Sequence, residues 1–401
     1  MNLTREEEAI LGGSGGNAAA KSMKILVALG EIYGAEKLIP ITSVQIAGVS
    51  YDNLGDPGLE YLAELAKDGQ VKVTTTLNPA GMDLLDWKKL GISPDFADKQ
   101  NKVIEAFAKM GVITCCTCTP YFIGNLPHYG EHVAWSESSA VTFVNSVVGA
   151  RTNREGGPSA IAAAMIGKTP AYGMHLEENR RPDILFDVQA SVKTLPDFGA
   201  LGYLIGKKAE GKTPYIKGVK TATTDQLKSF GGSVVTYGSK PLFHMEGITP
   251  EAHRYSEEPP KGRVTVSQKD LEEAYGALND QTGDIEFVSL GCPHASIDEI
   301  REIAEYLRGK KVKDGVEVWV ATARPTKMLA DNRGYTRIIE DAGAKMACDT
   351  CMVVAPLKGR FKNVATTSAK ACFYCRGKNK MQVKLGTFQQ CLKAAVTGRW
   401  N

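Results

Sequence analysis

The residues best suited to chemistry are the nine cysteines, and two spacings among them compete. One spacing is a pair of Cys-x2-Cys units, Cys348 with Cys351 and Cys372 with Cys375, separated by 20 residues. Four thiolates spaced in this way are typical of a structural zinc site, in which they close a tetrahedron around the metal. This pattern predicts a zinc-knuckle scaffold without enzymatic activity.

The second pattern takes one cysteine from each of three distant segments, Cys118, Cys292 and Cys351. Three thiolates can hold an iron–sulfur cluster and leave one iron with an open position, which then acts as a Lewis acid. No short motif decides between this pattern and the zinc site. The plainest alternative is that most of these thiols are buried small hydrophobic groups, as we expect for Cys391.

A polar stretch interrupts the Ala- and Val-rich middle of the chain. It contains Ser136-Glu137-Ser138-Ser139 and, further on, Arg151-Thr152-Asn153-Arg154. Two arginines at this spacing can clamp a carboxylate or a phosphate through paired hydrogen bonds. For any single residue, a helix cap or a surface ion pair is the alternative. Taken as a whole, the stretch predicts a polar binding site.

Alternating strands and helices must position these residues. Thr4 and Glu7 form a capping box that opens an N-terminal helix, and the glycine-rich segment 12–16 separates it from a second helix. The expected helices are 17–32, 98–110, 297–307, 327–342 and, with a break at 151–158, 136–164; the expected strands are 38–46, 71–77, 112–114, 284–290 and 316–321. Such alternation is typical of α/β layers with largely parallel sheets, whose ligands lie beyond the strand ends.

Length and composition indicate a globular chain of several lobes. For 401 residues we expect an α/β lobe at 1–210, a connecting lobe at 211–283 and a C-terminal α/β lobe at 284–401. The 48 basic and 45 acidic residues are mixed, which excludes the dense basic stripe of a nucleic-acid binder. No apolar run reaches the ~18 residues of a membrane helix, and the polar N-terminus does not resemble a signal peptide, so we expect a cytoplasmic protein.

Several longer motifs resemble the aconitase X family. They are Thr75–Asp83, Cys118–Tyr121, Ala134–Ala140, Gly149–Arg154, Gly291–His294 and Asp349–Cys351. The resemblance covers nearly the whole chain and implies a multi-lobed aconitase-superfamily core. The small swivelling domain that is fused onto longer relatives is absent from this sequence. The resemblance therefore also implies a separate small-subunit partner.

The resemblance assigns roles to single positions. Cys118, Cys292 and Cys351 match the family's cluster ligands, which implies a [4Fe-4S] cofactor. The positions that match the substrate pocket are Gly48, Val49, Ser50, Asn78, Pro79, Glu137, Ser138, Ser368 and Lys370. We take Glu137 and Ser138 as catalytic candidates, with Glu137 as an acid or a supporting group, and add Arg151 as a substrate-binding candidate. Cys372 and Cys375 depart from the family pattern, which keeps the zinc site open.

The implied reaction removes water from (R)-5-phosphomevalonate and gives trans-anhydromevalonate 5-phosphate, a step of isoprenoid synthesis through mevalonate. The reaction is difficult because hydroxide is a poor leaving group and because a carboxylate stabilises the adjacent carbanion poorly. An open iron can take up charge as the C–O bond breaks. The family implies that the base is a serine of the small subunit, so we expect this chain alone to be nearly inactive. Dehydration of another small hydroxy acid, such as cis-3-hydroxyproline, is the alternative reaction.

Overall fold

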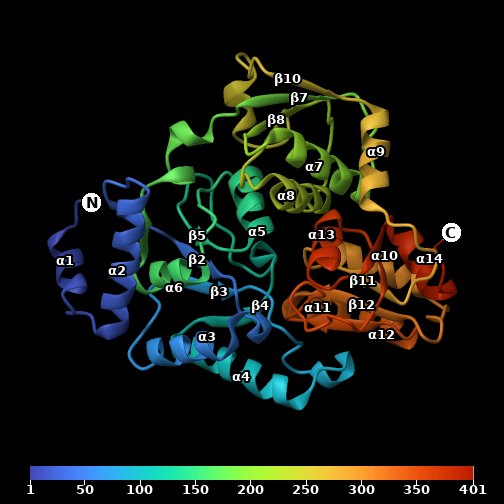
Figure 1. Ribbon diagram of the computed structural model, residues 1–401, viewed down its shortest axis with the longest axis horizontal. Helices are drawn as coiled ribbons and strands as arrows, with labels where there is room; N and C mark the ends of the chain where they lie inside the picture. The colour runs from blue at the N-terminus through green and yellow to red at the C-terminus, as the bar shows by residue number, and fades with distance from the viewer. Residues whose placement is uncertain (401) are drawn as a thin grey trace.

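Three sheets, each built only of parallel strands, carry the fold of the computed structural model, which describes residues 1–400. Each sheet belongs to one lobe, and Figure 1 shows the three lobes side by side. A two-stranded antiparallel ladder of β1 (Leu38–Pro40) with β6 (Lys168–Pro170) is the exception among the described strands. The expected fold class, α/β with largely parallel sheets, is confirmed.

The first lobe, blue to green in Figure 1, contains a four-stranded sheet in the order β4-β3-β2-β5. Its strands are β2 (Ser43–Ile46), β3 (Thr74–Leu77), β4 (Ile113–Cys116) and β5 (Ala134–Trp135). Its helices are α1 (Arg5–Leu11), α2 (Asn17–Ile32), α3 (Tyr51–Leu65), α4 (Pro94–Lys109), α5 (Ser138–Phe143) and α6 (Gly157–Ile166). Apolar side chains of α2, α3, α4 and α6 pack with the sheet into one core.

The second lobe contains a sheet in the order β10-β7-β8-β9. Its strands are β7 (Ile184–Val188), β8 (Pro214–Lys217), β9 (His244–Met245) and β10 (Arg263–Val266), and its helices are α7 (Leu195–Ala209), α8 (Thr224–Gly238) and α9 (Gln268–Leu278). The boundary expected at residue 210 falls between α7 and β8, which both belong to this lobe. Its helix α8 packs against α5 of the first lobe, at the centre of Figure 1.

The third lobe contains a five-stranded sheet in the order β13-β12-β11-β14-β15. Its strands are β11 (Phe287–Leu290), β12 (Glu317–Thr322), β13 (Lys345–Cys348), β14 (Asn363–Thr366) and β15 (Gln382–Leu385). Its helices are α10 (Ile297–Leu307), α11 (Arg324–Asn332), α12 (Tyr335–Asp341), α13 (Ala369–Gly377) and α14 (Phe388–Thr397).

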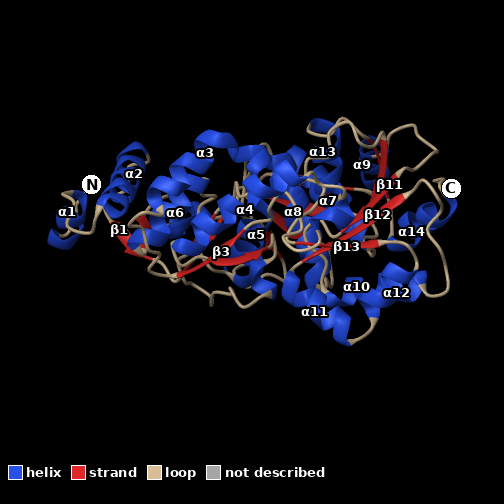
Figure 2. Ribbon diagram, turned by 90° about the horizontal axis from the view of Figure 1, so that it is seen from below, coloured by secondary structure: helices blue, strands red, loops and turns tan. Residues whose placement is uncertain are grey.

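Both faces of the third sheet are covered, with α13 on one side and α10 and α12 on the other (Figure 2). Along β12, Val318 and Val320 enter the core under α10, α12 and α14. The alternate residues Trp319 and Ala321 enter the opposite core, which is shared with the second lobe. Side chains of a strand alternate between faces, so an unbroken apolar strand such as β12 serves two cores at once.

Several expected elements are confirmed at the expected bounds, notably the helices at 17–32 and 297–307 and the capping box of Thr4 with Glu7. The single strand expected at 38–46 is wrong. Pro40 has no N–H for a ladder, and after it Thr42 donates to the carbonyl of His132 at 2.9 Å, where the chain crosses from one sheet to another. The single helix expected at 327–342 is also wrong, because Gly334 takes a left-handed conformation (φ 72°) that separates α11 from α12.

The helix expected at 136–164 is interrupted earlier than predicted. After α5, one π-helical turn follows at Val144–Val148, and the chain returns to a helix only at α6. No helix among the described residues is both long and apolar enough to cross a membrane. The cytoplasmic location stays a prediction.

Candidate active site

The three cysteines of the second sequence pattern follow the carboxyl ends of parallel strands. Cys118 lies just beyond β4, Cys292 just beyond β11 and Cys351 just beyond β13. The turn before Cys292 requires glycine: Gly291 has φ 88°, and a Cβ atom there would lie 2.0 Å from the carbonyl oxygen of Ala321. The strand ends therefore deliver one thiol each, as the α/β alternation predicted.

The three thiols come from two lobes, Cys118 from the first and Cys292 and Cys351 from the third. The backbone N–H of His294, two residues after Cys292, donates to Cys118 Sγ at 3.1 Å. Burial raises the pKa of Cys292 to about 12, and the neighbouring Cys351 adds to the rise while Lys370 opposes it. Burial likewise raises the pKa of Cys118, to which both Cys292 and Cys351 contribute. A buried set of thiols that must lose protons together is the expected state of a metal site without its metal.

The donor set fits a cluster better than a single ion. Among residues 1–400, no group of three His, Cys, Asp or Glu side chains is arranged to close around one metal ion. Cys292 and Cys351 nevertheless lie close enough to Cys118 to raise its pKa, and Cys351 close enough to Cys292 to raise the pKa of that thiol. Thiols that neighbour one another without meeting at one point suit a cluster in which each thiolate binds its own iron.

The four-cysteine zinc knuckle is not formed. Cys348 faces the charged side chains of Arg324, Asp83 and Asp349. Cys372 lies within α13 and donates from Sγ to the carbonyl of Ser368 at 3.3 Å. The spacing misled because Cys348, at the end of a strand, is turned toward a different neighbour from Cys351.

Beside the cysteines lies a buried ion pair of Glu137 and Lys370. Glu137 is the N-cap of α5, where its carboxylate accepts from the N–H of Ala140 at 2.8 Å and from Ser139 Oγ at 2.6 Å. Burial by itself raises the pKa of Glu137, but Lys370 and these donors bring it below its ordinary value. Glu137 is thus a carboxylate and an acceptor, which favours the supporting role over the acid.

Lys370 occupies an unusual place for a cation. It lies in the first turn of α13, where the helix dipole disfavours positive charge, and its side chain is only 7% exposed. Glu137 and Ser139 accept two of its hydrogen bonds, the latter at 3.2 Å. The nearby thiols of Cys292 and Cys118 raise the pKa of Lys370 further. Buried charged groups with shifted pKa values gather at functional sites, so Lys370 remains a candidate for substrate binding.

Two loops predicted to bind substrate contact the loop that carries Cys351. Ser50 Oγ donates to the carbonyl of Val354 at 3.0 Å, and the N–H of Ala80 donates to the carbonyl of Asp349 at 2.7 Å. The side chain of Gln45 joins these loops to the ion pair, because its Oε1 accepts from the N–H of Glu137 at 3.1 Å. Its Nε2 lies 3.5 Å from Oδ1 of Asn78. Most of the predicted site residues therefore belong to one connected region.

A cavity of about 330 Å³ opens beside this region. Its polar walls are Gly48, Ser136, Arg154 and Glu155, and its apolar walls come from α3, α4 and α6. Arg154 has no ion-pair partner among residues 1–400. Glu155 is buried, which raises its pKa, and its Oε1 accepts no hydrogen bond from residues 1–400. Ser159 Oγ donates to the other oxygen, Oε2, at 2.6 Å. An unpaired guanidinium and a carboxyl group with one free oxygen on one cavity suit a small ligand with an anionic end and a polar end.

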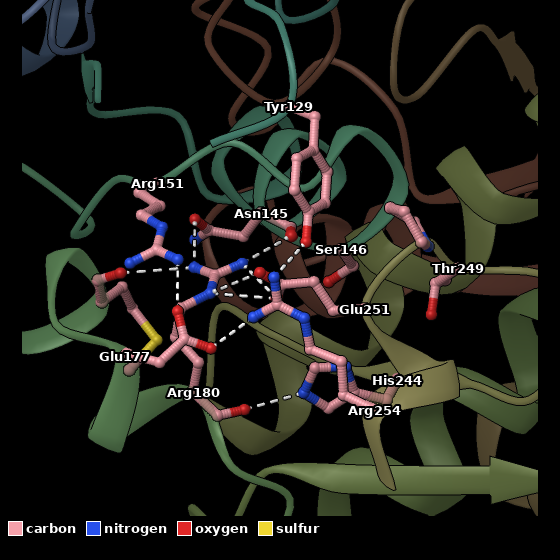
Figure 3. Close-up of polar contacts among 12 residues, drawn as sticks. Tyr129, Asn145, Ser146, Arg151, Glu177, Arg180, His244, Thr249, Glu251 and Arg254 are labelled. Atoms are coloured by element: carbon pink, nitrogen blue, oxygen red, sulfur yellow. Dashed lines mark hydrogen bonds and ion pairs between the residues drawn. The ribbon is translucent and has the colours of Figure 1, made fainter. Parts of the chain in front are cut away.

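Arg151 lies elsewhere, in the polar cluster drawn in Figure 3. It pairs with Glu177, which is also paired with Arg254 at 2.5 Å. Behind them, Arg180 is fully buried and donates to Glu251, to Asn145 and to the carbonyl of Met174. This cluster joins the first lobe to the second, and the structure does not bring Arg151 to the cysteines.

Comparison with known proteins gives matches over almost the whole chain. Residues 1–178, 182–276 and 285–397 match the first, second and third domains of aconitase X. A phosphomevalonate dehydratase large subunit of Methanosarcina mazei is 46% identical and covers 100% of this chain and 98% of its own length. The crystal structure of Thermococcus kodakaraensis aconitase X (holo-form) superposes with a TM-score of 0.92 at 47% identity, over 98% of this chain and 100% of that one.

The chain belongs to the aconitase X family. The resemblance stated from the sequence motifs is thereby confirmed. A cis-3-hydroxy-L-proline dehydratase of Hypocrea jecorina is 33% identical over 99% of this chain but only 69% of its own length. Both kinds of relative are named dehydratases, which agrees with the expected hydro-lyase class.

Some members of this aconitase X site were missed from the sequence. Gln45 gave no signal, because a glutamine in a strand usually marks a solvent-exposed position. His294 stood in the quoted motif Gly291–His294, but only Cys292 was given a role. Arg154 was named with Arg151 as a possible anion clamp, and its unpaired state became visible only from its surroundings.

Proposed function

We propose that this chain is the large subunit of a hydro-lyase that removes water from (R)-5-phosphomevalonate together with a separate small subunit. One observation carries the proposal: the chain aligns from end to end with proteins named phosphomevalonate dehydratase large subunit, at 46% identity for M. mazei and 47% for T. kodakarensis. The hydroxyproline dehydratase, in contrast, is longer by about a third of its own length. The words "large subunit" in the names of the end-to-end relatives support a partner supplied by a separate chain.

In this proposal, Cys118, Cys292 and Cys351 hold an iron–sulfur cluster as thiolates. When bound, such a cluster supplies a Lewis acid that weakens the bond between carbon and the leaving hydroxyl. The burial of Cys118 and Cys351 and the half-burial of Cys292 support this role, since a low-dielectric surrounding strengthens electrostatic stabilisation of the departing oxygen.

The side chains around the cluster bind and orient the substrate. Lys370 presents a fixed ammonium whose remaining N–H can donate to a substrate carboxylate, and Glu137 keeps that ammonium charged and in place. Ser138, at the start of α5, is a further donor at this turn. The unpaired Arg154 and the backbone at Gly48 offer an anion site across the cavity, where we place the other anionic end of the substrate. This arrangement leaves the base to the small subunit.

The test is an assay of the chain co-purified with its small subunit under anaerobic conditions. We expect water loss from (R)-5-phosphomevalonate, no turnover of mevalonate or cis-3-hydroxyproline, and almost no activity of the chain alone. Arg154→Gln removes one charged hydrogen-bonding group of about 1.5–3 kcal/mol, so KM should rise about 10- to 100-fold. The exposed Arg308→Gln is the matched control and should leave KM unchanged. Preferred turnover of cis-3-hydroxyproline would refute (R)-5-phosphomevalonate as the substrate. Full activity without the small subunit would refute the proposal that the small subunit supplies the base.

A further inference from the structure

One fully buried histidine, His294, contacts all three cysteine-bearing turns. Its backbone N–H donates to Cys118 Sγ at 3.1 Å, and its own turn carries Cys292. Its ring Nδ1 lies 3.0 Å from Oγ1 of Thr117, the neighbour of Cys118. Its ring Nε2 lies 3.0 Å from the carbonyl oxygen of Thr350, the neighbour of Cys351.

The second lobe reaches the same residue. The ammonium of Lys228, on α8, donates to the carbonyl of His294 at 3.1 Å. Lys228 is itself buried and is held by Glu299 and, at 2.9 Å, by Asp225. Groups from all three lobes therefore converge on His294, whereas each cysteine belongs to a single lobe.

The hydrogen-bond partners fix where the imidazole carries its proton. A backbone carbonyl oxygen can only accept, so Nε2 must carry a hydrogen and donate to Thr350. Nδ1 shares the other ring hydrogen bond with the hydroxyl of Thr117. Thr117 Oγ1 in turn accepts from the N–H of Thr119 at 3.1 Å and shares a hydrogen bond of 3.1 Å with the hydroxyl of Thr119. Both ring nitrogens of His294 therefore have partners beside cysteine ligands, one next to Cys118 and one next to Cys351.

We propose that His294 is a positioning residue whose backbone and ring hydrogen bonds fix the three cysteine-bearing turns relative to one another and so control how tightly the cluster is held. The proposal rests on the proposed function in one respect, that these cysteines hold a cluster. Groups that orient metal ligands from behind commonly contribute 10- to 100-fold in metal affinity. The three ligands here lie far apart in the sequence, so their relative placement depends on tertiary contacts of this kind.

The test reconstitutes the protein anaerobically with ferrous iron and sulfide and follows iron release to a chelator. We expect His294→Ala to release iron about 10- to 100-fold faster than the wild type. His294→Asn keeps an acceptor near Thr117, and His294→Gln keeps a donor near Thr350. The iron-release rate of each should therefore lie between the rates of His294→Ala and the wild type. The matched control is His244→Ala, which removes an equally buried histidine whose ring donates to the carbonyl of Arg180 at 2.8 Å. It should release iron at the wild-type rate.

A second readout separates positioning from general destabilisation. After reduction of the loaded fraction with dithionite, which makes a [4Fe-4S] cluster paramagnetic, its electron paramagnetic resonance spectrum should change in the His294 variants, because the cysteine geometry changes, and should not change in His244→Ala. If the alanine variant does not fold, the asparagine and glutamine variants decide. Wild-type release rates and spectra in the folded His294 variants would overturn the proposal. A wild-type protein that takes up no iron and sulfide would instead overturn the proposed cluster, which is a distinct result.

Discussion

Replacing Glu137 by glutamine tests whether the buried ion pair of the site works as a unit. The side chains of Glu137 and Lys370 are 6% and 7% exposed. Glu137→Gln preserves shape but leaves the ammonium buried without a charge partner, which typically costs about 3–5 kcal/mol of unfolding free energy. Lys370→Met should cost less, because the carboxylate keeps its donors from Ser139 and Ala140. In the double variant neither charge remains, so stability should recover by about 1–3 kcal/mol relative to the sum of the single variants.

The assay is urea unfolding of the two single variants and the double variant, followed by tryptophan fluorescence. Glu177→Gln is the surface control: its side chain is 51% exposed, so its ion pairs are screened and the change should be about 1 kcal/mol or less. Activity should behave differently from stability, because the double variant lacks the ammonium and should stay inactive even where stability recovers. A Glu137→Gln effect below about 1 kcal/mol, or strict additivity in the double variant, would refute the reasoning.

Three further predictions concern stability. Burial lowers the pKa of His175 to about 3, so below its ordinary pKa the unfolded chain binds a proton that the folded chain does not. The free energy of unfolding is therefore fully present above the ordinary pKa and decreases as the pH falls toward 3, by about 2 kcal/mol from pH 6.5 to 5. Urea unfolding of His175→Asn should show a shallower pH dependence. Gly291→Ala forces a Cβ to 2.0 Å from a backbone carbonyl, so we expect a loss of at least ~3 kcal/mol by the same assay, and wild-type stability would contradict the close approach. Arg324 pairs with the buried Asp83 of the first lobe and Asp349 of the third; Arg324→Met should cost about 3–5 kcal/mol, and a change below 1 kcal/mol would argue against this link between the lobes.

Local signals in the sequence predicted much of the fold. The capping box of Thr4 with Glu7 and the apolar period of 297–307 depend on neighbours within a few residues, and both are confirmed. The errors occurred where contacts between residues far apart in the sequence determine the local structure. The run 38–46 consists mostly of strand-forming residues on both sides of Pro40, but its two halves pair with different sheets. Local propensity carries no information about which partner a strand finds.

The candidate site shows the same division. That cysteines follow strand ends was visible from the alternation of elements, and the motifs resembling the family pointed to Cys118, Cys292 and Cys351. The cysteine spacing alone favoured the zinc knuckle, because an argument from spacing assumes that cysteines close in the sequence are also close in space. Glu137 and Lys370, which form a hydrogen bond, lie 233 positions apart in the sequence, and no pattern within either segment predicts their contact. The free state of Arg154 is likewise a property of its surroundings rather than of its sequence.

The measurement that tests the central claim most directly is the iron, sulfide and zinc content of the anaerobically purified protein, compared among the wild type, Cys292→Ala and Cys372→Ala. Both variants replace one cysteine by alanine and remove the same Sγ atom; Cys372 is buried and Cys292 is half-buried. We predict iron and sulfide in the wild type and in Cys372→Ala, their loss in Cys292→Ala, and no stoichiometric zinc. Zinc in the wild type that disappears in Cys372→Ala, with no iron in any of the three proteins, would contradict the account.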